Sequence, residues 1–110
     1  MSASKPSFAE ADVVLTLAID VSPEKRGLLL DFCRRAFPVY ESVGGCAMAL
    51  YEDASRPGRF NEVGYYLTME DYRRGEDAIR NDPEQARLIA EWRSLLSAPP
   101  DVSVHRKLAV

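Results

Sequence analysis

Histidine and cysteine, the residues that most often bind metals, are scarce in this 110-residue chain, which has one His and two Cys. A structural zinc site takes four ligands, most of them Cys or His, so the composition predicts no metal site. Cys33 and Cys46 both lie in apolar patterns and are too few for a disulfide framework. We interpret them as small core residues.

Apolar runs long enough to span a membrane are also missing, because none approaches the roughly 20 residues that a transmembrane helix needs. The first residues, MSASKPSFAEAD, lack the apolar segment of a secretory signal. We therefore expect a cytoplasmic protein without a membrane partner. The serine-hydrolase motif G-x-S-x-G and the glycine-rich phosphate-binding loops do not occur either, which argues against both kinds of site.

The chain has no excess of positive charge, since its formal net charge is -3. Nucleic-acid binding needs a basic surface, so we expect no nucleic-acid partner. What is present is a 46% hydrophobic composition typical of a globular protein, in a chain of a length that suits one core. We predict a flexible arm over residues 1–12 and a single domain over residues 13–110.

Hydrophobic periodicity and turn residues divide the domain into alternating elements. The predicted elements are a strand at 13–20, a helix from Ser22 to about Phe37, strands at 46–52 and 60–68, a helix from 69 that breaks at Asn81-Asp82-Pro83 and resumes, and a strand at 102–110. Ser22 and Thr68 are good N-caps, and Pro23 and Pro83 suit the first position of a helix. Pro38 is expected to end or kink the first helix.

This order of elements predicts an α+β, ferredoxin-like βαββαβ fold, in which a four-stranded antiparallel sheet carries its helices on one face. The other face would then be unusually apolar for a sheet in contact with water. The residues that we assign to this face are Val14, Ala18, Ala47, Ala49, Tyr51 and Tyr66. A contiguous apolar face usually marks an association surface, so we expect a homodimer packed through the two sheet faces.

The stretch YYLTMEDYRRGEDAIRNDPE, together with the order of elements, resembles the dimeric α/β-barrel superfamily. That superfamily includes the antibiotic-biosynthesis monooxygenase-like, NIPSNAP-like and stress-responsive barrel proteins. The resemblance covers residues 13–110 and implies a dimeric barrel. Members of the superfamily are oxygenases, isomerases, haem proteins or proteins without assigned activity. Monooxygenase-like members often carry a Trp where this chain has Tyr66, and a His where it has Gly75 or Glu76. Without those residues we expect neither haem nor another cofactor.

Four residues are candidates for a ligand site: Tyr66, Tyr72, Trp92 and His105. The aromatic side chains would frame an apolar cleft of the kind that binds flat organic molecules, although core packing explains them equally well. His105 and Glu62 are the candidate catalytic groups. His105 is the natural acid or base near neutral pH, but hydrogen bonding at a strand end is the commoner role. Glu62 is the carboxylate inside a predicted strand, and burial would raise its pKa, whereas an edge position would leave it solvated.

Two functions remain open on this reading. The first is a non-catalytic dimer that binds a small apolar or aromatic ligand between the sheet and the helices. The second is a cofactor-independent monooxygenase or isomerase that acts on an aromatic or polyketide-like compound. A titratable side chain that points into a closed cavity would favour the second.

Overall fold

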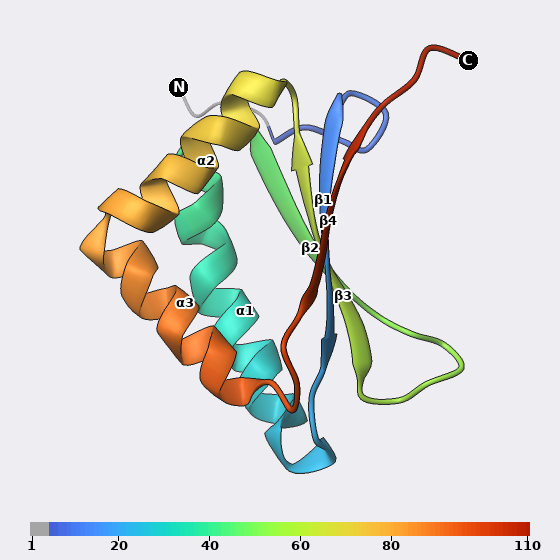
Figure 1. Cartoon of the computed structure of the whole chain (residues 1–110), viewed down its shortest axis with the longest axis vertical. Helices are drawn as coiled ribbons and strands as arrows, with labels where there is room; N and C mark the ends of the chain where they lie inside the picture. The colour runs from blue at the N-terminus through green and yellow to red at the C-terminus, as the bar shows by residue number, and fades with distance from the viewer. Residues whose placement is uncertain (1–4) are drawn as a thin grey trace.

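The computed structural model describes residues 5–110 as two layers, a sheet and a layer of helices that covers one of its faces (Figure 1). The elements in chain order are β1 (Val13–Asp20), a 3-10 turn η1 (Pro23–Lys25), α1 (Arg26–Glu41), β2 (Cys46–Glu52), β3 (Arg59–Tyr66), α2 (Met69–Asn81), α3 (Pro83–Leu95) and β4 (Asp101–Arg106). The predicted ferredoxin-like α+β fold is confirmed. Within residues 5–110, no helix is both long and apolar enough to cross a membrane.

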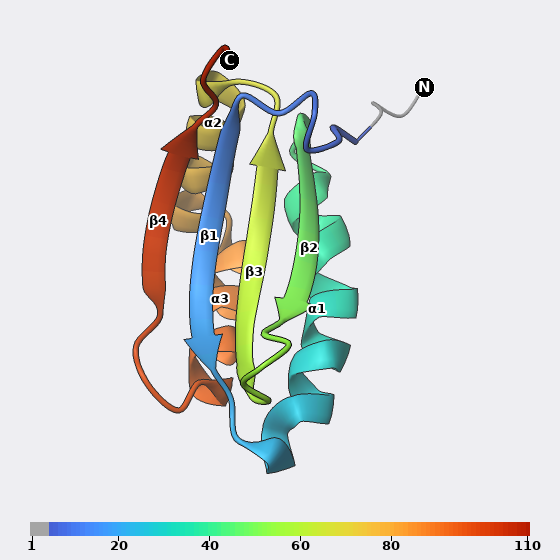
Figure 2. The same cartoon turned by 90° about the vertical axis from the view of Figure 1, so that its right-hand side faces the viewer.

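The four strands form one antiparallel sheet in the order β2-β3-β1-β4, which Figure 2 shows from its uncovered side. β1 lies inside the sheet between β3 and β4, so the first and last strands of the chain are neighbours. Because side chains alternate along a strand, the register also fixes which residues share a face. One row facing the helices runs Leu50, Glu62, Leu17 and Val102, and the next runs Met48, Gly64, Leu15 and Val104.

The break between α2 and α3 has the local cause that the sequence predicts. The Thr68 side chain caps α2 by accepting a hydrogen bond of 3.1 Å from the Asp71 N–H. Asp82 is extended and caps α3 by accepting a 3.0 Å hydrogen bond from the Glu84 N–H, with Pro83 as the first helical residue. The two helices therefore meet at an angle, and together they follow the sheet from one end to the other (Figure 1).

Several element boundaries differ from the prediction, and β3 ends at Tyr66, before the predicted position 68. α1 continues through Pro38 to Glu41, although Pro38 cannot donate an intrahelical hydrogen bond. Ser22 begins the short turn η1 without a side-chain cap bond, and α1 starts at Arg26. The last strand is shorter than expected and ends at Arg106.

The main core lies between the sheet and helices α1 and α3. Its buried members are Ile19, Val21, Leu29, Phe32, Cys33, Ala36, Phe60, Trp92 and Leu95. A second cluster, formed by Val13, Leu15, Cys46 and Tyr66, is covered by Met69 and Tyr72 of α2. Burial of these side chains is the principal term that stabilises the two layers against each other.

Part of the predicted N-terminal arm contacts the domain. Ala11 is buried, Lys5 makes a 2.9 Å ion pair with Glu41, and the Lys107 N–H donates a 2.8 Å hydrogen bond to the Asp12 carbonyl. Residues 1–4 of the arm lie outside the described residues. The division of the chain at residue 12 stays a prediction.

Candidate functional site

Tyr66 lies on the face of the sheet that the helices cover, and its predicted place on the open face is therefore wrong. It alternates with Phe60, Glu62 and Gly64, and the register puts this set of β3 residues against the helices. The other predicted members of the open face are placed there by the register: Val14, Ala18, Ala47, Ala49 and Tyr51. Tyr65, not Tyr66, is the tyrosine of β3 that joins them.

Two glycines make room for the Tyr66 ring between β3 and α2. A Cβ atom on Gly64 would lie 2.9 Å from Cε2 of Tyr66, and one on Gly75 would lie 3.4 Å from Cε1. The ring meets Tyr72 edge to face, with ring centroids 5.3 Å apart and planes at 87°. This geometry is favourable for aromatic pairs. Gly75 therefore has a packing role against the Tyr66 ring.

We expect Gly64→Ala to destabilise the fold by about 1–3 kcal/mol, because the new methyl group must displace the Tyr66 ring. Gly27→Ala is the matched control. A Cβ at Gly27 in α1 meets no atom within 4 Å, and the change should stabilise by up to about 1 kcal/mol. Urea unfolding of both variants measures the two effects. Equal stability of the two variants would contradict the close fit of Tyr66 over Gly64.

Glu62 is a buried carboxyl group inside the apolar core. Its side chain is on the helix-facing side of β3, and the residue is only 3% exposed. Among the described residues its Oε1 atom has no hydrogen-bond partner. Burial raises the pKa of Glu62 from 4.5 to about 7, because the apolar surroundings disfavour the charged form. Glu62 is thus a carboxyl group that titrates near neutral pH.

Trp92 of α3 brings a second unsatisfied polar atom to the same region. Its Nε1 lacks a hydrogen-bond partner among residues 5–110, although the residue is only 5% exposed. The indole opposes part of the pKa shift of Glu62, even though the two groups form no hydrogen bond of normal geometry. A buried donor and a buried acceptor therefore lie near each other, and both retain bonding capacity.

The charge of Glu62 also affects the pKa values of two residues of α1. Burial, and secondarily the negative charge of Glu62, raise the pKa of the Cys33 thiol to about 12 and hold the pKa of Tyr40 well above its usual range. Burial also raises the pKa of Cys46 to about 11. Both thiols thus stay protonated at neutral pH, which makes them poor nucleophiles. In residues 5–110 no three His, Cys, Asp or Glu side chains form a group that could hold a metal ion.

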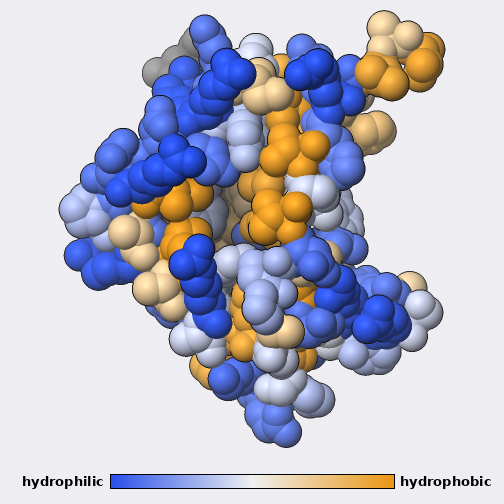
Figure 3. All heavy atoms as spheres, in the orientation of Figure 1, coloured by the Kyte–Doolittle hydropathy of each residue, from blue (hydrophilic) through white to orange (hydrophobic). Residues whose placement is uncertain are grey.

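A groove separates the helical layer from β4. Figure 3 shows it as a hollow with apolar side chains on both of its sides. β4 contributes Val102 and Val104, which face the helical side of the sheet but are 60% and 41% exposed because no helix covers this strand. In the row across the sheet, Leu17 lies between Val102 and Glu62, and in the next row Leu15 lies between Val104 and Gly64. The groove therefore runs beside the wall of side chains that contains Glu62.

His105 is not part of this groove within one chain. It lies opposite Val14 on the open face of the sheet, where the exposed ring is 3.1 Å from the Ser103 hydroxyl. The structure brings Tyr66 and Tyr72 into contact and places Trp92 in the neighbouring core cluster, close enough to Glu62 to affect its pKa. Sequence reasoning missed that Glu62 and Trp92 lie near each other. The available signal was a carboxylate in the interior of an apolar strand.

Solved structures share this fold over most of their length. A conserved protein from Methanosarcina mazei Go1 is 15% identical, with a TM-score of 0.77 over 92% of this chain and 97% of that chain. A Deinococcus radiodurans protein, provisionally assigned as an antibiotic biosynthesis monooxygenase, is 15% identical, with a TM-score of 0.72 over 89% and 94%. Rv0793 from Mycobacterium tuberculosis is 23% identical, with a TM-score of 0.70 over 89% and 96%.

These likenesses show the fold alone, given the low sequence identity. No family model matches the sequence, and a comparison with curated proteins found no match. At the level of the fold, the predicted resemblance to antibiotic-biosynthesis monooxygenase-like proteins is confirmed.

Proposed function

We propose that this protein binds a small, flat apolar or aromatic ligand in the groove between the helices and the sheet. The observation that carries the proposal is the pair of buried, unsatisfied atoms, Oε1 of Glu62 and Nε1 of Trp92. Leaving a buried polar group unpaired costs about 1–3 kcal/mol, so natural proteins keep few of them. Both atoms are closed to solvent in the free protein, and a ligand that displaces the side chains over them with one polar group on an apolar ring would satisfy both. The aromatic surfaces of Tyr66 and Tyr72 lie in the adjoining cluster.

Trp92 gives a direct test of this proposal. We expect a flat hydroxylated aromatic compound such as dihydroxyanthraquinone to quench its fluorescence in a saturable way. The chain has one tryptophan, so binding to the double variant with phenylalanine at Trp92 and Tyr66 is followed by the absorbance of the ligand. This variant should bind at least about tenfold more weakly, the loss expected from a buried hydrogen bond and its packing. Tyr51→Phe, on the open face, is the control and should bind as the wild type does. Saturable binding that persists in the double variant would place the site elsewhere.

A cofactor-independent monooxygenase or isomerase is the second candidate function. The observation in its favour is the pKa of about 7 for Glu62, which suits a group that removes and returns a proton near neutral pH. On this alternative, Glu62→Gln abolishes turnover of an aromatic or polyketide-like substrate while binding is retained. Equal turnover by the variant would rule Glu62 out as the base.

Homodimerisation through the open faces of the sheets is also part of the proposal. The centre of this face is largely apolar and is formed by small side chains of three neighbouring strands: Val14, Thr16, Ala18, Ala47, Ala49 and Val63. His105 and Ser103 lie on the same face and would form part of the interface. We further propose a cytoplasmic location, supported by the free thiols of Cys33 and Cys46.

Ala49→Glu is expected to convert the dimer into a monomer or an insoluble protein. Ala49 lies opposite Val63 in the middle of the open face, where a second sheet would bury the new carboxylate. An unpaired buried charge costs several kcal/mol, enough to weaken a dimer measurably. Ala86→Glu on the exposed side of α3 is the control. Sedimentation of the wild type as a 12.3 kDa monomer at micromolar concentration would refute the dimer.

A further inference from the structure

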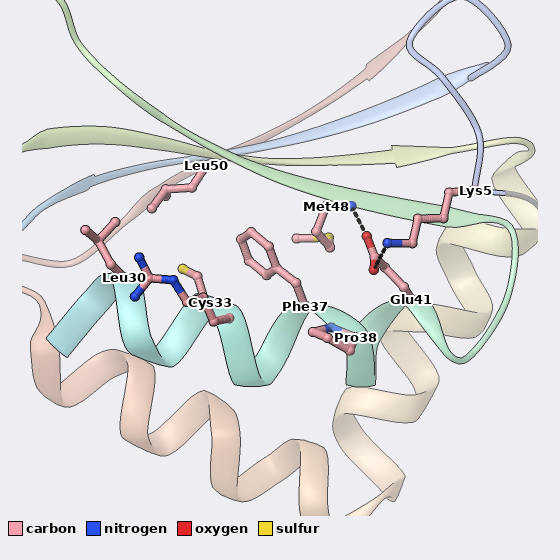
Figure 4. Close-up of a pocket in the computed structure, with 9 residues that line it drawn as sticks. Lys5, Leu30, Cys33, Phe37, Pro38, Glu41, Met48 and Leu50 are labelled. Atoms are coloured by element: carbon pink, nitrogen blue, oxygen red, sulfur yellow. Dashed lines mark hydrogen bonds and ion pairs between the residues drawn. The ribbon is translucent and has the colours of Figure 1, made fainter. Parts of the chain in front are cut away.

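A second hollow lies at the opposite edge of the sheet from the groove, between α1 and β2. Figure 4 shows apolar side chains of the helix and the strand that extend toward each other across a gap. The cleft measures about 400 Å³. The residues that line it include Leu30, Arg34, Phe37 and Glu41 of α1 and Met48 and Leu50 of β2. This volume lies within the range of roughly 300–1,000 Å³ typical of small-molecule sites.

One end of the cleft shows how a carboxylate fits this strand edge. Glu41 reaches from α1, and its Oε2 accepts a hydrogen bond of 2.9 Å from the Met48 N–H. Its Oε1 makes a 2.9 Å ion pair with Lys5 (Figure 4). Both oxygens are therefore bound, and the charge of Glu41 is balanced within the chain. A carboxylate against an outward-pointing N–H of β2 is thus a contact that the fold already makes.

The next outward N–H along the strand belongs to Leu50. Just beyond the two ends of β2, the Asp53 N–H bonds to the Arg59 carbonyl and the Leu67 N–H bonds to the Gly45 carbonyl. The backbone groups of the odd-numbered residues of β2 therefore point toward β3. The even-numbered residues, including Met48 and Leu50, point their backbone groups away from the sheet because backbone direction alternates along a strand. Since Leu50 also lines the cleft, its N–H is a donor available to a ligand there.

Arg34 supplies positive charge at this second position. It lies seven residues before Glu41 on α1, two helical turns away on the same side of the helix. Its only ion pair among the described residues is with Asp31 at 2.8 Å, with side chains 71% and 70% exposed. Exposed pairs of this kind contribute little and exchange readily. Arg34 and the Leu50 N–H together match a carboxylate, and the apolar lining matches a hydrocarbon chain.

We propose that the α1–β2 cleft is a second binding site, which takes a medium-chain aliphatic carboxylate. The chain lies against Leu30, Phe37 and Met48, and the carboxylate accepts hydrogen bonds from Arg34 and the Leu50 N–H. The site is independent of the groove that holds the proposed aromatic ligand, because the two lie at opposite edges of the sheet.

Titration of the ¹⁵N-labelled protein with octanoate tests this site. The expected result is a saturable shift of the Leu50 amide signal, with octylammonium of the same chain length producing none. Arg34→Gln should weaken octanoate binding about tenfold, the loss of one charge-assisted contact. Asp31→Asn should tighten it by up to about fivefold by releasing Arg34. Arg87→Gln, an exposed charge change on α3, is the control and should leave it unchanged.

Three outcomes would overturn the proposal: no saturable shift, equal binding of octylammonium, or equal affinity in Arg34→Gln. Shifts centred on the Trp92 indole with none at Leu50 would assign octanoate to the groove and likewise refute a second site. The aromatic ligand reports through Trp92 and the carboxylate through Leu50. Failure of one proposal therefore leaves the other measurable.

Discussion

Replacing Glu62 with glutamine is expected to stabilise the fold by about 3 kcal/mol at pH 8, the value of a pKa shift from 4.5 to about 7. In the folded protein the carboxyl group holds its proton more tightly than in the unfolded chain. Wild-type stability therefore falls as the pH rises from about 4.5 to about 7, and this loss is complete above that range. Glutamine does not titrate, so the variant lacks this loss.

Urea unfolding of the wild type and the variant from pH 4 to pH 8 measures the effect. The free energies of unfolding of the two proteins should agree at low pH. They should diverge between pH 4.5 and about 7, where Glu62 is protonated in the folded protein but ionised in the unfolded chain. Glu24→Gln, at an exposed site in η1, is the control and should keep the wild-type pH dependence. Parallel curves for the wild type and Glu62→Gln would show that the Glu62 carboxyl is solvated in solution.

Phe32→Ala is expected to remove about 3–5 kcal/mol of stability, a large share of the roughly 5–15 kcal/mol that holds a domain of this size folded. Phe32 is 0% exposed and lies on the face of α1 that packs into the main core. Its loss leaves a cavity that the neighbouring helix and strands fill only in part. Urea unfolding compares it with Phe8→Ala.

Phe8 is 75% exposed, and its replacement should change the free energy of unfolding by less than about 0.5 kcal/mol. Phe32→Leu keeps most of the volume and should fall between the two. A small loss for Phe32→Ala would mean that α1 does not pack on the sheet as described.

The order of elements was predictable because its signals are local. Thr68 with Asp71, and Asp82 with Pro83, fix helix starts through contacts within three residues of each other. The short, largely apolar runs at 13–20 and 46–52 likewise need no knowledge of the rest of the chain. The α1 boundary was missed because Pro38 was expected to end or kink the helix, whereas the turn that follows it stays helical to Glu41.

The faces of β3 were harder to assign, since both sets of its residues contain apolar and aromatic side chains. Only pairing with β1 decides that Tyr66 faces α2 and Tyr65 faces away. The same limit applies to His105, whose side of the sheet follows from its register with Val14. Local patterns do not determine register between strands that lie far apart in the sequence.

The candidate site also has one part that local sequence predicts and one that depends on the fold. Glu62 stood out as a carboxylate in an apolar strand, and its burial was one of two readings that the sequence left open. Its nearness to Trp92, thirty positions later on α3, depends on how the broken helix returns over the sheet. The bend at Pro83 sets that return, and its direction is a property of the folded layers.

The placement of β4 beside β1 has a consequence for how the chain folds. The two strands join residues 13–18 to residues 101–106, so almost the whole chain forms the loop that their pairing closes. Closing so long a loop costs entropy, and β4 offsets little of it because all six of its residues are exposed and no helix packs on it. We therefore expect β4 to be the last strand to join the sheet. We also expect its amide protons to be the first among the four strands to exchange with solvent in the native state, which hydrogen-exchange measurements test.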